Sequence, residues 1–479
     1  MLQSNKQGKK GTPFVPLPVE FREPEPIRWA ADPYQLEACA WLATRQSAAL
    51  FLDPGLGKTA ITLAAISYLM HTGKIKKVLV VAPLRVCHLV WPAEIKKWAD
   101  FNHLKLNVVH GPNKQKELDK KADIYVINPE GLRFLTDNQR VFKNLHFDVL
   151  VIDELTKFKN TKTQRFKQMK NLLATFKYRW GLTGSPAANG LEHLFGQVYM
   201  LDGGLSLGRY ITHYRNEYFK VDHSGFKYIP TTGSAERIYE KLKPICLRMA
   251  IADYVDMPIF RMNEIKVTLP DEAMMLYNEF EEELVVEIQN ETVTAVNAAI
   301  AAMKCRQVSN GAIYKEDRNE DKYGYIKIHN TKIEALQDLV EELQGQPLLV
   351  AYEFQHDLDR LMAVFPDAKY LGKGQKMSDA VEIEKQWNNG EIELLFGQPQ
   401  SMGHGLNLQK NCHNIAWFTP SWDLELFDQF NDRVYRRGNA SPTVVCHVII
   451  ALNTVDELVM KSLKRKENVQ KNLFAALKK

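Results

Sequence analysis

The chain has 479 residues, 45% of them hydrophobic and 25% charged, which is ordinary for a globular protein and enough for roughly two to four domains. No apolar run reaches the roughly 18 residues that a membrane-spanning helix needs, and the 6 cysteines form no C-x-x-C pair. These features argue against a membrane protein, a disulfide framework and a zinc site. The net charge of +5 permits a phosphate-backbone partner without requiring one. We expect a soluble intracellular protein, cytoplasmic in a bacterium or phage-infected cell and nuclear in a eukaryote.

The predicted elements begin after a segment at residues 1–28 that is rich in Pro, Lys and Glu, which predicts a flexible N-terminus. Short apolar runs then alternate with helical patterns such as 59–70 and 90–98, an order typical of parallel sheets covered by helices. The runs in the first part that we interpret as buried strands are 48–52, 77–82, 124–128, 149–153 and 179–183. The runs in the second part are 347–352, 392–396, 414–418 and 443–450.

Two longer helical patterns separate the two series of strands. Residues 270–289 and 292–307 carry apolar residues at three- and four-residue spacing. A last basic and amphipathic helical pattern covers 461–479. The predicted fold is therefore α/β, with two lobes that are each a parallel sheet with helices on both faces, and a helical insertion between them.

The first chemical signal is a glycine-rich turn between a predicted strand and a predicted helix, D-P-G-L-G-K-T at 53–59. In such a phosphate loop, the backbone N–H groups around Gly55 and Gly57 and the helix N-terminus face the phosphates. Lys58 would reach the β- and γ-phosphate oxygens, and the Thr59 hydroxyl would bind Mg²⁺. The strict pattern has glycine where this chain has Leu52. A chance glycine-rich turn is the alternative, which the strand–turn–helix order disfavours.

Two carboxylates, Asp153 and Glu154, stand at the end of the predicted strand at 149–153. Asp153 would hold Mg²⁺ through water, and Glu154 would orient and deprotonate the water that attacks the γ-phosphate. The alternative is a solvated acidic turn. Far along the chain, D-R-V-Y-R-R at 432–437 offers Arg433 and Arg436 to stabilise charge on the transferred phosphate. A solvated basic helix face is the alternative there.

The order of these motifs resembles the Swi/Snf family of superfamily two helicase-like ATPases across roughly residues 30–465. The resemblance is carried by a longer series of strings. These are P-Y-Q-L-E at 33–37 (the adenine-reading Q motif), V-L-V-V-A-P-L at 78–84 (motif Ia), N-P-E at 128–130 (motif Ib), L-T-G-S-P at 182–186 (motif III), K-C-R-Q-V-S-N at 304–310 (the helical protrusion), L-L-V-A-Y at 348–352 (motif IV), G-H-G-L-N-L at 403–408 (motif V) and Q-F-N-D-R-V-Y-R-R-G at 429–438 (motif VI).

Some positions depart from the family pattern. Where many relatives have D-E-x-H, this chain has Thr156, a difference that concerns the coupling of hydrolysis to movement. Met402 replaces the first glycine of motif V, and Tyr435 and Asn439 replace the usual His and Gln of motif VI. The chain shows no histone-tail reader, zinc module or nuclease, which favours a bacterial or phage-type member.

The resemblance implies two RecA-like lobes that bind ATP and Mg²⁺ in the cleft between them. Its expected boundaries are 29–245 for the first lobe, 246–328 for a crossing segment and helical protrusion, and 329–479 for the second lobe. Gln35 would read the adenine. Gln429 would join the two arginines on the catalytic side of the second lobe.

The resemblance further implies a motor that translocates on double-stranded DNA, remodels duplex or branched DNA, or displaces bound protein. Contacts would be mainly to phosphates, with Arg85 and Asn407 as candidate contacts. We expect a monomer, because one chain supplies both halves of the site, and a protein partner is compatible with it. The alternatives are a strand-separating DNA or RNA helicase, a non-enzymatic nucleic-acid-binding scaffold, and the motor subunit of a larger complex.

Overall fold

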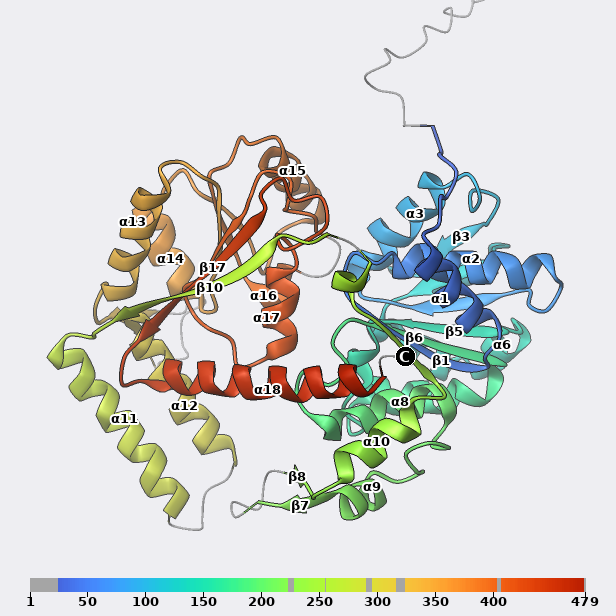
Figure 1. Cartoon of the computed structure of the whole chain (residues 1–479), viewed down its shortest axis with the longest axis horizontal. Helices are drawn as coiled ribbons and strands as arrows, with labels where there is room; N and C mark the ends of the chain where they lie inside the picture. Colours follow the sequence, from blue (N-terminus) through green and yellow to red (C-terminus); the bar gives the residue numbers. More distant parts are fainter. Residues whose placement is uncertain are drawn as a thin grey trace, which may run out of the picture.

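The computed structural model describes residues 25–222, 228–254, 256–289, 295–315, 324–402 and 406–477. Two parallel sheets form the centres of two lobes, as the sequence predicts (Figure 1). Most of the segment expected to be flexible, 1–28, lies outside the described residues, and so do residues 403–405 of motif V. Among the described residues, no helix combines the length and the apolar character that crossing a membrane requires.

The first lobe is built on a sheet of seven parallel strands. Its strands, in spatial order, are β3 (Leu106–Val108), β4 (Ile124–Ile127), β2 (Val78–Val81), β5 (Val149–Asp153), β6 (Tyr178–Thr183), β1 (Ser47–Leu52) and β9 (Cys246–Met249). Side chains alternate between its faces: Ala49 and Phe51 enter one hydrophobic core, whereas Leu50 and Leu52 enter the other. Five of the seven strands were predicted. The apolar runs that predict them are buried on both faces, as parallel strands require.

Helices cover both faces of this sheet. The helices that line one face are α1 (Pro33–Ala43), α2 (Lys58–His71) and α3 (Trp91–Lys97), the last preceded by a π-helical turn (Val86–Val90). Those on the other face include α7 (Gln164–Leu172), α8 (Leu194–Asp202), α9 (Ile211–Tyr218) and α10 (Ser234–Leu242). Smaller elements of this lobe are α4 (Lys114–Asp119), α5 (Leu132–Asp137), α6 (Gln139–Asn144), the hairpin of β7 (Phe219–Val221) and β8 (Tyr228–Pro230), and the single helical turns η3 (Pro129–Gly131), η4 (Leu155–Phe158), η5 (Leu173–Thr175), η6 (Leu191–His193) and η7 (Ile251–Asp253).

The second lobe has six parallel strands. Their spatial order is β10 (Ile259–Val267), β17 (Thr443–Ala451), β16 (Asn414–Trp417), β13 (Leu348–Ala351), β15 (Leu394–Gly397) and β14 (Lys369–Leu371). Side chains alternate here too: Leu349 and Ala351 enter one hydrophobic core, whereas Leu348 and Val350 enter the other. The helices of this lobe are α13 (Thr331–Leu343), α14 (Gln355–Val364), α15 (Met377–Asn388), α16 (Pro399–Met402), α17 (Leu424–Asn431) and α18 (Val455–Leu477).

The helical insertion projects from the second lobe. It consists of α11 (Asp271–Gln289), α12 (Ala295–Asn310) and the hairpin of β11 (Ala312–Tyr314) and β12 (Tyr325–Lys327). A buried polar network ties α12 to the lobe: the Asn310 amide donates to Asp357 at 2.9 Å, and Lys332 donates to the Asn310 oxygen at 2.9 Å. The two predicted helices are confirmed as helices, but they interrupt the second lobe between β10 and α13 and do not lie between the two sheets.

The expected boundary at residue 245 has to be corrected. β9 pairs with β1 inside the first sheet, so the first lobe continues to Met249, and β10 pairs with β17 along its whole length, so 259–267 belongs to the second sheet. Pairing at a sheet edge joins residues far apart in the chain, which local periodicity does not reveal. The C-terminal helix α18 also belongs to both lobes. It runs from the second lobe to the first (Figure 1), where Leu473 and Leu477 enter the first lobe's core.

Candidate active site

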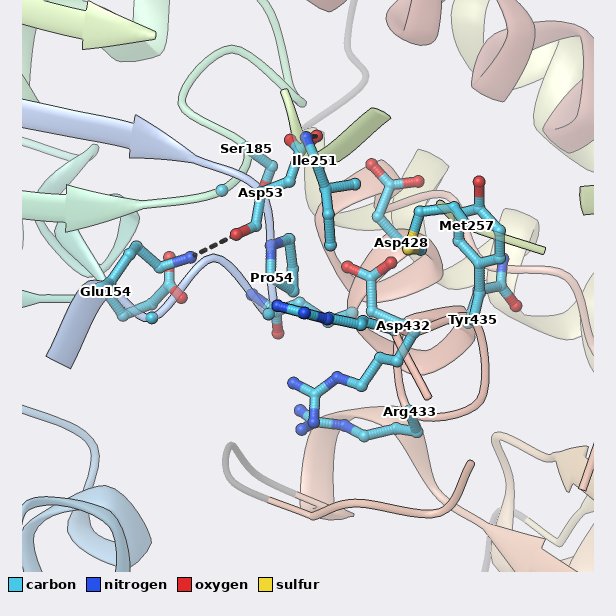
Figure 2. Close-up of a pocket in the computed structure, with 18 of the residues that line it drawn as sticks. Asp53, Pro54, Glu154, Ser185, Ile251, Met257, Asp428, Asp432, Arg433 and Tyr435 are labelled. Carbon is cyan, nitrogen blue, oxygen red and sulfur yellow. Dashed lines mark hydrogen bonds between the residues drawn. The ribbon is translucent and has the colours of Figure 1, made fainter. Parts of the chain in front are cut away.

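A cleft of about 940 Å³ lies between the two lobes. Figure 2 shows Asp53 and Glu154 from the first lobe and Asp432 and Arg433 from the second facing into it. All the residues predicted to bind nucleotide or to act in hydrolysis line this cleft, namely Gln35, Gly55, Gly57, Lys58, Thr59, Asp153, Glu154, Gln429, Arg433 and Arg436. Its volume falls in the range of roughly 300–1,000 Å³ that is common for small-molecule sites.

The phosphate loop joins β1 to α2, as expected. Gly55 and Gly57 have φ angles of +90° and +80°, a region that side chains disfavour and that glycine adopts freely. The Lys58 ammonium donates to the carbonyl oxygens of Leu52 and Asp53 at 2.8 and 3.3 Å. Burial lowers its pKa, and the carboxylate of Glu154 and other nearby carboxylates oppose that shift. The Lys58 ammonium is thus held by two backbone carbonyls at the start of the loop, which phosphate oxygens would replace.

Gln35 lies against this loop. Its oxygen accepts from the Asp32 backbone at 3.0 Å in the first turn of α1, and its amide donates to the Leu56 carbonyl at 3.3 Å. A Cβ atom added at Gly57 would come within 2.7 Å of the Gln35 amide nitrogen. The backbone angle favours glycine at this position, and a side chain there would also displace the Gln35 amide.

The acidic end of β5 faces the same cleft. The Trp91 indole N–H donates to the Asp153 carboxylate at 2.9 Å, and burial nonetheless raises the pKa of Asp153 to about 6. Thr59 and Asp153 supply the oxygen donors that a hard cation such as Mg²⁺ prefers, with substrate phosphates and water completing its shell. The donor set fits Mg²⁺ bound together with ATP.

Glu154 adopts a left-handed backbone conformation with φ +72°, which is rare for a side-chain-bearing residue and concentrates at functional sites. Two hydroxyls hold its carboxylate: Thr156 donates to its Oε1 at 2.7 Å, and Thr183 of motif III donates to the same oxygen at 3.1 Å. The side chain expected to orient water is therefore fixed by neighbours from two motifs.

The arginines of the second lobe follow α17. Arg433 and Arg436 both donate to the Leu406 carbonyl, at 3.2 and 3.4 Å, and Arg436 also donates to the side chain of Asn407. Burial and the neighbouring Arg436 lower the pKa of Arg433 to about 9. Gln429 donates to Glu425 at 3.4 Å. The predicted second half of the site is thus present in the cleft, with its guanidinium groups bound to their own lobe.

The two residues predicted to contact nucleic acid meet at the junction of the lobes, outside the cleft lining. Arg85 forms an ion pair with Glu384 of α15 at 3.3 Å, and the other Glu384 oxygen accepts from the Asn407 backbone at 2.9 Å. Burial raises the pKa of Glu384, opposed by that backbone bond and by the arginines. Their role in DNA binding stays a prediction.

Several residues of the site had no functional prediction, and Arg248 is one of them. Arg248 of β9 forms an ion pair with Asp53 of the phosphate loop at 2.6 Å and donates to the Phe51 carbonyl at 2.9 Å. The Ile251 backbone donates to the other Asp53 oxygen at 2.9 Å. The segment that leaves the first lobe therefore binds both carboxylate oxygens of Asp53 in the phosphate loop. No local sequence pattern signals this, because the partners lie almost two hundred residues apart.

Comparison with known proteins agrees with this geometry. The family model of the SNF2-related domain matches residues 34–313. Protein p41 of Acyrthosiphon pisum secondary endosymbiont phage 1 is 33% identical over 465 residues, covering 93% of this chain and 98% of p41. The ATP-dependent helicase YqhH of Bacillus subtilis is 21% identical over 91% of this chain and 78% of its own length.

Longer relatives match over part of their length. The chromatin remodeling factor mit1 of Schizosaccharomyces pombe is 23% identical over 91% of this chain but only 32% of mit1. Among solved structures, the SWI2/SNF2 ATPase core of Sulfolobus solfataricus in complex with dsDNA aligns over 94% of both chains, with 23% identity and a TM-score of 0.45. Since the family model spans more than half of the chain and p41 matches along nearly its full length, the chain belongs to the SNF2-related family of helicase-like ATPases.

Proposed function

We propose that this protein is an ATP-driven motor that translocates on double-stranded DNA, and so remodels DNA structures or displaces bound protein. The observation that carries the proposal is the shared cleft: Lys58 and Glu154 of one lobe and Arg433 and Arg436 of the other line it together. A nucleotide bound there would contact both lobes, so its binding and hydrolysis would change how the lobes are held to each other. Such alternation is what stepping along a polymer requires.

The chemistry follows from the side chains. Lys58 would exchange its carbonyl partners for β- and γ-phosphate oxygens, and Glu154 would orient the water and accept its proton as the β–γ bond breaks. Arg433 and Arg436 would leave the Leu406 carbonyl to neutralise charge that develops on the γ-phosphoryl group. Mg²⁺, held near Thr59 and Asp153, supplies further neutralisation when it is bound.

A nucleic-acid partner is supported by the family and by the mildly basic chain, whose relatives bear the names of helicases and chromatin remodeling factors. Arg85 and Asn407 are the proposed backbone contacts. Because such contacts go to phosphates, binding would weaken steeply with salt and depend little on base sequence. One chain supplies both halves of the cleft, so we propose a monomer as the working unit.

The test is steady-state ATP turnover without nucleic acid and with single-stranded DNA, duplex DNA, forked DNA and RNA. We expect duplex or forked DNA to stimulate turnover, and Glu154→Gln to reduce it by about a hundredfold or more, the scale of a lost general base. Lys58→Ala should also abolish it, whereas Lys74→Ala, an exposed lysine just beyond the same helix, should not. Displacement of a third strand from a DNA triplex would then report translocation.

Other outcomes discriminate the alternatives. Stimulation by single strands or RNA alone, with separation of a labelled fork, would support a strand-separating helicase. Turnover that survives Lys58→Ala would refute the site. No turnover under any condition would favour the non-enzymatic scaffold, unless a co-purifying partner restored it, which would point to a motor subunit.

A further inference from the structure

The second lobe brings a third arginine to the cleft, next to the two assigned to the γ-phosphate. Arg437 follows Arg436 directly, and both side chains line the cleft. Arg433 and Arg436 donate to a carbonyl of their own lobe at 3.2 and 3.4 Å. The Arg437 guanidinium instead lies 3.8 Å from the Asp32 carboxylate of the first lobe. Side chains of this segment, such as Arg433 and Tyr435, point in different directions (Figure 2), and Arg437 reaches a part of the cleft that its neighbours do not.

Asp32 marks the end of the cleft where the base of a nucleotide is expected. It immediately precedes α1, and its backbone N–H donates at 3.0 Å to the oxygen of Gln35, the expected adenine reader. The Gln35 amide in turn donates to the Leu56 carbonyl of the phosphate loop at 3.3 Å. A nucleotide with its phosphates in this loop and its base against Gln35 would therefore place the base beside Asp32 and, across the cleft, beside Arg437.

Aromatic side chains complete this end of the cleft. Trp29 lines it, and Tyr34 of α1 stacks on Tyr254, with 4.6 Å between the ring centroids and 30° between the ring planes. Burial and the Asp32 carboxylate raise the pKa of Tyr34, and the Arg437 guanidinium opposes that shift, which places Arg437 close to this ring as well. A guanidinium group is planar, stacks on aromatic faces and carries five hydrogen-bond donors. These properties suit the face and the edge of a purine base.

The ion pair that Arg437 makes can be exchanged for a ligand. The Arg437 and Asp32 side chains are 61% and 46% exposed, and 3.8 Å is a long separation for such a pair. Exposed ion pairs contribute little to stability, because water screens the charges and two mobile side chains have to be ordered. Arg437 therefore loses little when it leaves Asp32 to bind a base that enters between the lobes.

We propose that Arg437 is a nucleotide-binding residue of the second lobe that covers the purine base, while Arg433 and Arg436 act at the γ-phosphate. The proposal rests on the proposed ATPase function of the same cleft. Arg437 would contact a part of the nucleotide that is the same in ATP and ADP and does not change during hydrolysis. Its contact would stabilise the ground state and the transition state alike, so losing it should raise KM for ATP without lowering kcat.

The first test compares ligands with and without a base. Arg437→Met keeps the length of the side chain and removes the guanidinium. It should weaken the binding of ADP and of a non-hydrolysable ATP analogue by the same factor, about three- to tenfold, the scale of one stacked cation. Binding of inorganic tripolyphosphate, which carries no base, should not change. Arg209→Met, at an exposed arginine of the first lobe that does not line the cleft, is the matched control and should bind all three ligands as the wild-type protein does.

Turnover separates Arg437 from the arginines at the γ-phosphate. In Arg437→Met, KM for ATP should rise by the same factor as the dissociation constant of ADP, and kcat should not fall. Arg436→Met should instead lower kcat by about a hundredfold or more and leave ADP binding nearly unchanged. Unchanged ADP affinity in Arg437→Met, or an equal loss of affinity for ADP and tripolyphosphate, would overturn the proposal while Lys58-dependent turnover upheld the proposed function.

A second measurement locates the base without turnover. ADP that carries a photoreactive azide on its base should attach, on irradiation, to the peptide that covers 434–441 as well as to the first lobe, and excess ADP should prevent this labelling. Label confined to the first lobe would overturn the proposal even in an active enzyme. Label on 434–441 in a wild-type protein that hydrolyses no ATP would count against the proposed function and leave the base contact standing. A wild-type protein that binds no ADP would overturn both.

Discussion

Asp432 gives the sharpest prediction about the cleft. It follows α17 and lines the cleft beside Arg436 and near Asp53 of the opposite lobe. Burial raises its pKa to about 7, a shift that Arg436 opposes and the Asp53 charge reinforces. In the unfolded chain, an aspartate ionises near pH 3.9, so the difference amounts to about 4 kcal/mol as an upper limit, since the cleft admits solvent.

The sign of the effect follows from the raised pKa. Well below pH 4, Asp432 is protonated in both the folded and the unfolded protein, so it does not change the free energy of unfolding. As the pH rises to about 7, Asp432 ionises first in the unfolded chain, and the free energy of unfolding falls. Asp432→Asn cannot ionise and should escape this loss. Between pH 5.5 and 8.5, roughly 2 kcal/mol of the difference should be visible, or about 4–8 °C in the melting temperature of a lobe of this size.

The assay is thermal melting of the wild-type protein and Asp432→Asn across that pH range without nucleotide. Asp367→Asn, an exposed aspartate in the turn that follows α14, is the matched control and should melt as the wild-type protein does at each pH. The stabilisation by Asp432→Asn should grow as the pH rises. A difference that is independent of pH, or one that shrinks with rising pH, would refute the reasoning.

Two further predictions concern a glycine of the phosphate loop and a buried ion pair. Gly57→Ala should weaken nucleotide binding and destabilise the first lobe by roughly 1–3 kcal/mol, because the new Cβ meets the Gln35 amide at 2.7 Å on a strained backbone. Gly73→Ala, at φ +69° with open space around it, measures the backbone cost alone. Equal melting temperatures and equal nucleotide titrations of the two variants would contradict the prediction. Lys332→Met should cost about 3–5 kcal/mol in chemical denaturation, because it leaves Asp456, its fully buried partner at 2.7 Å, without a counter-charge; an unchanged unfolding midpoint would contradict it.

Local pattern was enough to predict the centre of each sheet and the phosphate loop and acidic strand end that line the first-lobe side of the cleft. The strands β1, β2, β5 and β6 are continuous apolar runs, and the chemistry at 53–59 and 153–154 sits at their carboxyl ends. The arginines of 432–437 could be assigned only through the order of motifs, because a basic run has no distinctive local signal. That order, rather than any single string, led to the correct family.

What the sequence could not reveal is which distant side chains pair. The short strand β3 is only partly buried, and β9 and β10 are edge strands whose partners lie far away in the chain. The same holds for the site: the contacts of Asp153 with Trp91 and of Asp53 with Arg248 join residues that have no common local pattern. Each is decided by tertiary packing, so a motif gives the chemistry of a residue but not its partners.

The junction at Glu384 shows why this matters for function. Arg85 and Asn407 were predicted as separate contacts to a phosphate backbone, yet Glu384 binds the Arg85 guanidinium and the Asn407 backbone across the two lobes. Arg85 can bind a phosphate only by leaving this carboxylate or by sharing it, and the same loop carries the Leu406 carbonyl that holds Arg433. In this arrangement, the groups proposed for DNA and for ATP are bound to one loop. A displacement of this loop would therefore alter the hydrogen bonds of Arg433 and of Glu384, the partner of Arg85.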